Sequence, residues 1–231
     1  MEAIFYHKQF GAKLNNIKND LPLLKDFICI NDDSDADEVI EKSHDFENLI
    51  SNESQSRLCV ERSGDDKYIL YTGGTTGMPK GVVREHGGVV LTVRAYMQQQ
   101  GVRSDDTLMS VLSLGHANAQ ALCLFCAIGA GATAVFFPKF SASNFFKWAH
   151  DCGATCVNML GAVAEYLYAS KPSEFDQKHS IRIMLGSPAP RNLDDFQKRF
   201  NVRVIDGYGS TEMGICLLYT SDAADEGLGV D

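Results

Sequence analysis

The stretch Tyr71–Gly81 reads YTGGTTGMPKG and combines four glycines, three threonines and one lysine, Lys80. A glycine backbone bends freely and lets a ligand approach closely. Threonine hydroxyls and free backbone N–H groups donate hydrogen bonds to phosphate oxygens, and Lys80 places a positive charge beside them. These residue types predict a phosphate-binding loop.

Two common phosphate-binding motifs do not fit this stretch. A P-loop carries Gly-Lys-Ser/Thr at the start of a helix, whereas here Pro79 precedes Lys80 and Gly81 follows it. A dinucleotide-binding loop needs G-x-G-x-x-G between a strand and a helix. Gly207–Gly209 begins that pattern, but Glu212 occupies the position of its last glycine. The sequence therefore excludes both motifs.

The elements that must position this loop follow from the hydrophobic pattern, because apolar runs alternate with segments of helical periodicity. The predicted strands are Ala3–Tyr6, Phe27–Ile30, Tyr68–Tyr71, Thr107–Leu112, Ala132–Phe137, Thr155–Asn158, Ile181–Leu185 and Val202–Ile205, with a further strand starting at Gly81–Val83. The predicted helices are Gln9–Asn19, Gly87–Gln99, Asn118–Ile128, Ser143–Cys152, Val163–Ser170 and Leu193–Phe200. This alternation predicts an α/β fold with a mostly parallel layered sheet and flanking helices.

Two polar loops follow predicted strands. The glycine-rich loop follows Tyr68–Tyr71, and Gly207–Gly209 follows Val202–Ile205. Ligands of parallel-sheet folds gather at the carboxyl ends of the strands. We therefore expect these two loops, which are far apart in the sequence, to face one crevice.

Charge and composition restrict the partners. The 231 residues carry a net charge of −9, without the basic surface that nucleic-acid binding needs, so we expect no nucleic-acid partner. Asn31–Ser56 is polar and acidic, which predicts a solvated connection with one short helix at Phe46–Ser51. The first residues lack a secretory signal, and seven cysteines are typical of free thiols in a reducing compartment, so we expect a cytoplasmic protein.

The uncharged segment Ala121–Phe137 is long enough to resemble a membrane span. Gly129–Gly131 interrupts it, which favours a buried helix, a glycine turn and a buried strand, without a membrane span. The spacings of Cys123 with Cys126 and of Cys152 with Cys156 also allow a zinc site. No histidine pair nearby completes a ligand set, so core packing is the favoured role of these cysteines.

The stretch YTGGTTGMPKGVV resembles the signature loop of the adenylate-forming enzymes, which include acyl-CoA synthetases, luciferase-like enzymes and peptide-synthetase adenylation domains. Gly73 stands where many members carry serine. Three further segments resemble the same family in the same order: SLGHANAQA (Ser113–Ala121), LGSPAP (Leu185–Pro190) and VIDGYGSTEMG (Val204–Gly214). The region 115–163 most resembles the crotonobetaine/carnitine-CoA ligase-like acyl-CoA ligases. The resemblance implies that the chain is an incomplete N-terminal large domain of an adenylate-forming enzyme.

The resemblance also implies a reaction. A small-molecule carboxylic acid would attack the α-phosphate of ATP, giving acyl-AMP and pyrophosphate, and coenzyme A would then displace AMP to form a thioester. Magnesium would assist, and fatty acid metabolism is the implied setting. Alternatives stay open. The acceptor could be a carrier-protein thiol, or there could be no thiol acceptor at all; the chain could also be a catalytically inactive nucleotide-binding fragment or a protein–protein module.

Family positions carry over onto individual residues of this sequence. Tyr208 would stack on the adenine, Asp206 would lie near its amino group, Thr211 would contact the α-phosphate and Glu212 would hold Mg²⁺. The implied ATP-binding residues are Thr72, Gly73, Gly74, Thr75, Thr76, Gly77, Lys80, Gly186, Ser187, Pro188, Asp206, Gly207, Tyr208, Gly209, Ser210 and Thr211. The implied catalytic residues are His116, Thr211 and Glu212, the acyl contacts His116, Asn158 and Gly161, and the magnesium ligands Glu212 and Thr76. A structural role for His116 and a close-packing role for Gly161 are the alternatives.

Family members are longer than this chain, so the resemblance predicts a fragment that is inactive by itself, with Met1 as an internal start. We predict three segments: residues 1–66 as an incomplete α/β portion with the acidic connection, residues 67–215 as the AMP-binding core, and residues 216–231 as a non-native tail. The tail contains CLLYTSDAADE, which resembles a translated sequencing-library adapter. A divergent native tail is the alternative.

Overall fold

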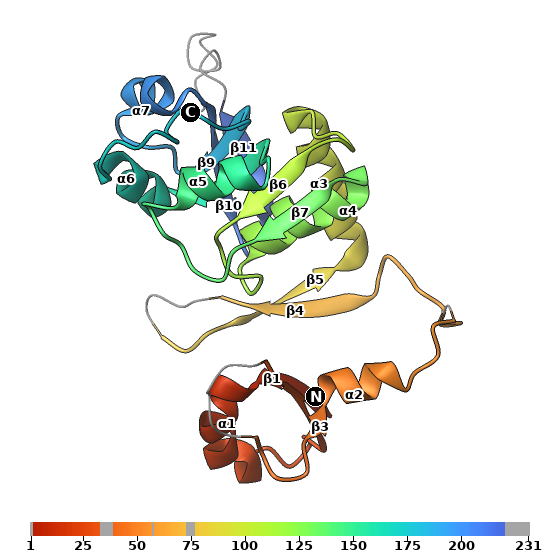
Figure 1. Ribbon diagram of the computed structural model, residues 1–231. Helices are drawn as coiled ribbons and strands as arrows, with labels where there is room; N and C mark the ends of the chain where they lie inside the picture. The colour runs from red at the N-terminus through yellow and green to blue at the C-terminus, as the bar shows by residue number, and fades with distance from the viewer. Residues whose placement is uncertain (1, 33–38, 57, 73–76, 220–231) are drawn as a thin grey trace. The chain divides into compact units, whose positions relative to one another are not determined.

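The computed structural model describes residues 2–32, 39–56, 58–72 and 77–219, with the backbone alone for residues 214–219. Contacts divide the chain into two units, Met1–Glu61 and Arg62–Asp231, which Figure 1 colours from red to blue along the sequence. Gly73, Gly74, Thr75 and Thr76 of the predicted phosphate loop lie outside the described residues, as does most of the predicted tail.

The smaller unit is a three-stranded parallel sheet in the order β1-β2-β3. Its elements are β1 (Ala3–His7), η1 (Lys8–Phe10), α1 (Gly11–Ile17), η2 (Lys18–Asp20), β2 (Asp26–Ile30), β3 (His44–Asp45) and α2 (Phe46–Ser51). Ile40 is buried in its core, and its N–H donates to the Tyr6 hydroxyl at 2.9 Å. The acidic connection is therefore only partly solvated: β3 and Ile40 were not predicted, because one buried residue in a polar stretch leaves no periodic signal.

The larger unit contains a six-stranded sheet in the order β11-β10-β9-β8-β6-β7 and a separate two-stranded hairpin, β4-β5. The strands are β4 (Lys67–Tyr71), β5 (Gly81–Glu85), β6 (Thr107–Ser110), β7 (Thr133–Phe136), β8 (Cys156–Leu160), β9 (Ile183–Ser187), β10 (Arg203–Ser210) and β11 (Gly214–Tyr219). All neighbours in the large sheet run parallel except β10 and β11. The predicted α/β class with a mostly parallel sheet is confirmed.

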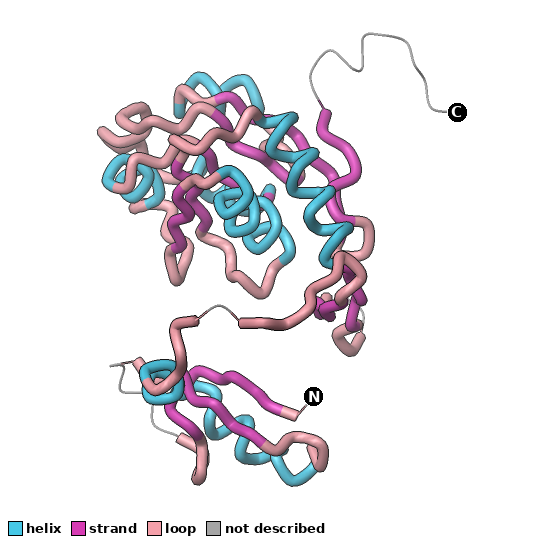
Figure 2. The backbone as a smooth tube through the Cα atoms, turned by 90° about the vertical axis from the view of Figure 1, so that its right-hand side faces the viewer, coloured by secondary structure: helices cyan, strands magenta, loops and turns pink. Residues whose placement is uncertain are grey.

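Helices cover both faces of this sheet (Figures 1 and 2). One face packs against α3 (His86–Gln100), the π-helix η3 (Ala119–Phe125) and α4 (Cys126–Ala130), and the other against α5 (Phe145–Asp151), α6 (Gly161–Ala169) and α7 (Leu193–Phe200). Each face has its own hydrophobic core, and neighbouring strand residues alternate between the two. Leu108 packs in the core with α3, η3 and α4, and Met109 packs in the core with α5, α6 and α7. Burial on both faces explains why the strands are continuous apolar runs.

The segment Ala121–Phe137 forms the predicted helix, turn and strand, with Gly131 in the left-handed conformation that ends α4. Within the described ranges, no helix is both long and apolar enough to cross a bilayer. Cys123 and Cys126 are fully buried, which confirms their predicted packing role. Burial raises the pKa of each thiol to about 12, so both stay protonated at neutral pH.

Two predictions about the loops were wrong. β4 does not join the parallel sheet but pairs antiparallel with β5. The connection between them is short, which suits a hairpin, since a parallel crossover needs about a dozen residues or more. Gly207–Gly209 is not a loop after a strand either: β10 runs on to Ser210, with an irregular register at Tyr208 and Gly209. Such bulges accommodate glycine within a strand.

A buried ion pair fixes the end of the sheet where β6, β8 and β9 begin. Asp106 is 2% exposed, and Arg182 donates to its carboxylate at 2.6 Å. The hydroxyl of Thr155 donates to the same carboxylate at 2.7 Å. Arg182 also donates to the carbonyl of Gly101 at 2.9 Å, so one cluster joins three strand ends to the end of α3.

Candidate functional site

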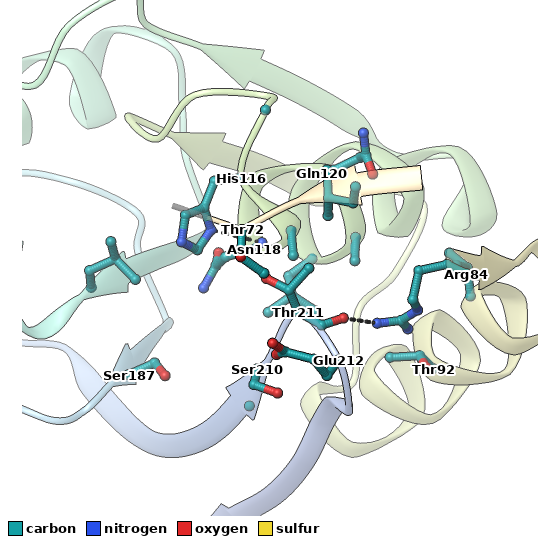
Figure 3. A pocket seen from close by; sticks show the side chains of 18 of the residues that line it. Thr72, Arg84, Thr92, His116, Asn118, Gln120, Ser187, Ser210, Thr211 and Glu212 are labelled. Carbon is teal, nitrogen blue, oxygen red and sulfur yellow. Dashed lines mark hydrogen bonds between the residues drawn. The ribbon is translucent and has the colours of Figure 1, made fainter. Parts of the chain in front are cut away.

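A cavity of about 760 Å³ in the larger unit is lined by residues of the β4-β5 hairpin and of the end of β10 (Figure 3). Hairpin residues, the segment before η3, the end of β9 and the end of β10 all contribute to its lining. The predicted site residues that line it are Thr72, His116, Ser187, Gly207, Tyr208, Gly209, Ser210, Thr211 and Glu212. Thr72, at the start of the glycine-rich loop, and Gly207–Gly209 therefore line one cavity; Gly73–Thr76 lie outside the described residues, so the expectation for the rest of the loop stays a prediction.

The hairpin closes the base of the glycine-rich loop. The N–H of Thr72 donates to the carbonyl of Lys80 at 2.9 Å, so the loop starts and ends at one point. Residues of β4 and β5 alternate in exposure, and Tyr68 and Leu70 line the cavity. Lys80 and Gly77 are exposed and do not line it.

The end of β10 presents an aromatic ring and an acid. Tyr208 lies at the bulge with 56% of its surface exposed, so its ring is available to a ligand. Glu212 follows β10. Its own backbone N–H and then the hydroxyl of Ser210 lower the pKa of the Glu212 carboxyl, and the charge of Lys80 lowers it further. Glu212 is therefore ionised at neutral pH, and Lys80 lies within electrostatic range of the site.

Arg84 on β5 is a site residue that the sequence analysis missed. Its guanidinium Nη1 donates to the backbone carbonyl of Thr211 at 2.7 Å (Figure 3). This bond joins the hairpin to the turn after β10, and Arg84 also lines the cavity. One signal in the sequence could have revealed it: Arg84 is a charged residue at a position of β5 where the alternation of exposure predicts a partly buried side chain.

His116 presents one ring nitrogen to the cavity. The backbone N–H of His116 donates to the carbonyl of Ser113 at 2.9 Å, and its ring Nδ1 accepts the backbone N–H of Asn118 at 3.1 Å. This bond assigns the neutral ring the tautomer that carries its hydrogen on Nε2. The exposed ring of His116 thus offers a hydrogen-bond donor.

The predicted adenine segment is tied to β10. The carboxylate of Asp206 accepts the N–H of Ala189 at 2.8 Å. Ser187 lines the cavity, whereas Gly186, Pro188 and Asp206 do not. The structure therefore places Asp206 as a link between the two segments.

Asn158 and Gly161 do not line the cavity. Asn158 is 3% exposed; its amide accepts the hydroxyl of Tyr96 at 2.6 Å and donates to the carbonyl of Leu122 at 2.8 Å. A Cβ atom on Gly161 would lie 2.9 Å from the ring of Pro188. The cavity offers neither predicted acyl contact, and the close-packing alternative fits Gly161.

Gly186 is equally confined, and we expect Gly186→Ala to lower the free energy of unfolding by about 1–3 kcal/mol. A Cβ atom there would lie 2.9 Å from the backbone Cα of Ala189, which cannot rotate away. Urea denaturation measures the effect. The matched control is Gly88→Ala in α3, which meets nothing within 4 Å and should be neutral or slightly stabilising. Equal effects of the two substitutions would contradict the close packing.

A second cavity, of about 610 Å³, adjoins the first. Tyr68, Val89 and Gln120 line both cavities. The other residues of the second are mostly apolar and belong to α3, η3 and α4: Val90, Val93, Met97, Phe125 and Ile128, with His86, Arg94 and Gly129. The second, mainly apolar cavity therefore shares part of its wall with the first.

The residues of the site would suit a magnesium ion that is held mainly by the phosphates of a bound nucleotide and by few protein side chains. Over the described ranges, no group of three or more His, Cys, Asp or Glu side chains forms a protein cage for a metal. Mg²⁺ typically keeps several waters and binds one or two carboxylates together with substrate phosphates. The ionised carboxylate of Glu212 meets that need, and Thr76 lies outside the described residues.

Comparisons with known proteins agree with this geometry. The family profile described as "AMP-binding enzyme" matches residues 2–229. Long-chain fatty acid transport protein 5 of Mus musculus is 34% identical over 152 residues, covering 65% of this chain and 22% of that protein. Crotonobetaine/carnitine-CoA ligase of Shigella flexneri is 32% identical over 168 residues, covering 71% of this chain and 33% of that protein. The chain thus spans a third or less of these relatives.

Solved structures show the same fold. An anthranilate CoA ligase in complex with anthranoyl-AMP has a TM-score of 0.81 at 23% identity, covering 91% of this chain and 41% of that one. The inhibitor-bound N-terminal domain of FACL13 from Mycobacterium tuberculosis has a TM-score of 0.76 at 22% identity, covering 91% and 51%. At these identities the likeness extends to the architecture alone.

Proposed function

The chain belongs to the family of AMP-binding enzymes, and from this we propose that it is part of an ATP-dependent acyl-CoA ligase. The proposed enzyme activates a carboxylic acid as acyl-AMP and then forms a coenzyme A thioester. One observation carries the proposal: a hairpin that holds the glycine-rich loop and a strand end that bears Tyr208 and Glu212 line a single cavity.

The nucleotide would lie across this cavity. Tyr208 would stack on the adenine, and Thr211 would donate to the α-phosphate. The loop between Thr72 and Lys80 would surround the β- and γ-phosphates, where its N–H and hydroxyl groups counter the charge that grows on the leaving pyrophosphate. Glu212 would hold Mg²⁺, which when bound neutralises phosphate charge.

The acid would approach from the side of His116. The Nε2–H group of that residue is a suitable donor to the carboxylate, and it orients the carboxylate oxygen toward the α-phosphate. Beyond Gln120, the apolar second cavity would take the remainder of the acid. Its apolar lining favours an acid with a hydrocarbon portion.

Nucleotide binding tests the first part of the proposal. We expect the 231-residue chain to bind ATP with Mg²⁺ in isothermal titration calorimetry, and Tyr208→Ala to weaken this binding by about 0.5–1.5 kcal/mol through loss of stacking. Tyr166→Ala is the matched control, because Tyr166 is 64% exposed on α6 and does not line the cavity. Equal affinities of the two variants would contradict the role of Tyr208.

The reaction itself is tested in the full-length protein encoded by the parent gene. We propose acid-dependent exchange of pyrophosphate into ATP, measured with a panel of carboxylic acids. Product analysis with free coenzyme A and with a carrier protein then identifies the acceptor thiol. Failure of every acid in the exchange assay would refute the enzymatic proposal.

A further inference from the structure

We propose that Arg84 is a phosphate-contacting residue of this site, which neutralises the α-phosphate and at the same time holds the backbone of Thr211. The proposal rests on the proposed function, since it assigns a residue to the same nucleotide. Arg84 lies outside both the glycine-rich loop and the segment Val204–Gly214.

The position of Arg84 in the hairpin is unusual for a charged residue. In β5 exposure alternates, with Val82 and Arg84 on the partly buried side. These two residues pair with Leu70 and Tyr68 of β4, which line the cavity. A cation among such neighbours is costly unless another group compensates its charge. The alternation would otherwise place an apolar residue at this position.

Within the part of the chain that the structure describes, no carboxylate forms an ion pair with Arg84; Glu212 lines the same cavity but does not pair with it. The ion pair nearest in sequence joins Glu85 to Lys67 on the exposed side of the hairpin, at 4.0 Å. Among the described residues, Arg84 makes one hydrogen bond, from Nη1 to the carbonyl of Thr211. A guanidinium carries five N–H donors, so most of its donors remain for a ligand.

The surroundings indicate an anion as that ligand. Arg84 lines the cavity with the polar residues Thr72, Ser210 and Thr211 (Figure 3). The planar fork of a guanidinium matches two oxygens of a phosphate, and such charge-assisted pairs are about twice as strong as neutral hydrogen bonds. Because Arg84 is bonded to Thr211, the phosphate next to Thr211 is the one within its reach. The α-phosphate is present in ATP and AMP but not in adenosine, which provides the test.

The test compares adenosine, AMP and ATP by calorimetric titration of the 231-residue chain. For Arg84→Gln we expect about tenfold weaker binding of AMP and ATP and unchanged binding of adenosine. Arg84→Lys keeps the positive charge but lacks the planar fork of the guanidinium. Its affinity for AMP and ATP should therefore lie between that of Arg84→Gln and that of the wild type. Arg103→Gln is the matched control, because Arg103 is exposed, pairs with Asp105 and lies outside the cavity.

The outcomes separate phosphate contact from a purely structural role. If Arg84 acts only by holding Thr211, Arg84→Gln has no further effect on AMP binding in a chain that already carries Thr211→Ala, and the proposal is overturned. Unchanged AMP binding in Arg84→Gln overturns it as well. If the wild-type chain binds no nucleotide, the proposed function fails, and titration with inorganic pyrophosphate then tests Arg84 directly: equal affinity of wild type and Arg84→Gln overturns the inference. Thermal unfolding verifies that each variant is folded, and Arg84→Lys serves as the test variant if Arg84→Gln is not.

Discussion

Asp106→Ala is expected to lower the free energy of unfolding of the larger unit by about 3 kcal/mol. Removing one partner of a buried ion pair typically costs about 3–5 kcal/mol, because the other charge stays buried without compensation. The low end of this range applies here, because the side chain of Arg182 is 32% exposed and water can solvate part of its charge. Urea denaturation followed by circular dichroism measures the loss.

The ion pair also predicts a pH dependence. Burial alone would raise the pKa of Asp106, but hydrogen bonds from Arg182, Thr155 and the backbone of Arg103 outweigh it, and the pKa lies below its ordinary value. The stabilisation is therefore complete above the unfolded-state pKa of about 3.9 and is lost as the pH falls through the lower folded-state value. Asp106→Asn should remove this part of the acid sensitivity.

Asp105→Ala is the matched control for Asp106. Asp105 pairs with Arg103 on the surface, and both side chains are more than half exposed. An exposed pair contributes about 0–1 kcal/mol, so this variant should unfold nearly like the wild type. If Asp105→Ala and Asp106→Ala lose the same stability, the assignment of the buried pair is wrong.

Glu212→Gln is expected to remove most of the gain in ATP affinity that magnesium provides, by at least about tenfold. Mutation of a residue that only hydrogen-bonds to a metal ligand already lowers metal affinity about 10–100-fold. Glu212 is proposed as a direct ligand, so its loss should have at least this effect. The comparison is calorimetric titration with ATP in the presence of Mg²⁺ and in the presence of EDTA. Without the metal, the variant should bind ATP at least as well as the wild type, because a negative charge near the phosphates is gone.

Glu174→Gln is the control for this measurement. Glu174 lies on the surface near Lys178, with 73% of its side chain exposed, and does not line the cavity. Its magnesium dependence should equal that of the wild type. Glu212 is not the metal ligand if Glu212→Gln responds to magnesium as strongly as this control does.

Local signals in the sequence predicted much of the fold. The helices Phe46–Ser51 and Leu193–Phe200 have their predicted bounds. Asp45 caps the first by accepting the N–H of Asn48, and in the second Phe196 and Phe200 are fully buried while acidic residues occupy the first turn. Such features lie within one element, so they are visible without knowledge of its neighbours.

The errors arose where a structure depends on a distant partner. An apolar run such as Tyr68–Tyr71 does not reveal which strand it will pair with, so β4 was wrongly assigned to the parallel sheet. The bond from Tyr96 to Asn158 joins residues 62 positions apart, and that from Arg84 to Thr211 joins residues 127 apart. The family was predicted correctly, because the motif YTGGTTGMPKGVV is specific to it. The roles of the individual site residues stay predictions.

The π-helix η3 has a consequence for how such a site can diversify. A π-helix closes its hydrogen bonds over one residue more than an α-helix does, and single π-helical turns are frequent at functional sites. Here Leu122 faces the first cavity, Phe125 faces the second, and Gln120 borders both. Loss of one residue from this turn would restore ordinary winding and rotate a different set of side chains toward each compartment. A change in this one turn would thus alter the shape of both cavities while the strands of the sheet keep their positions.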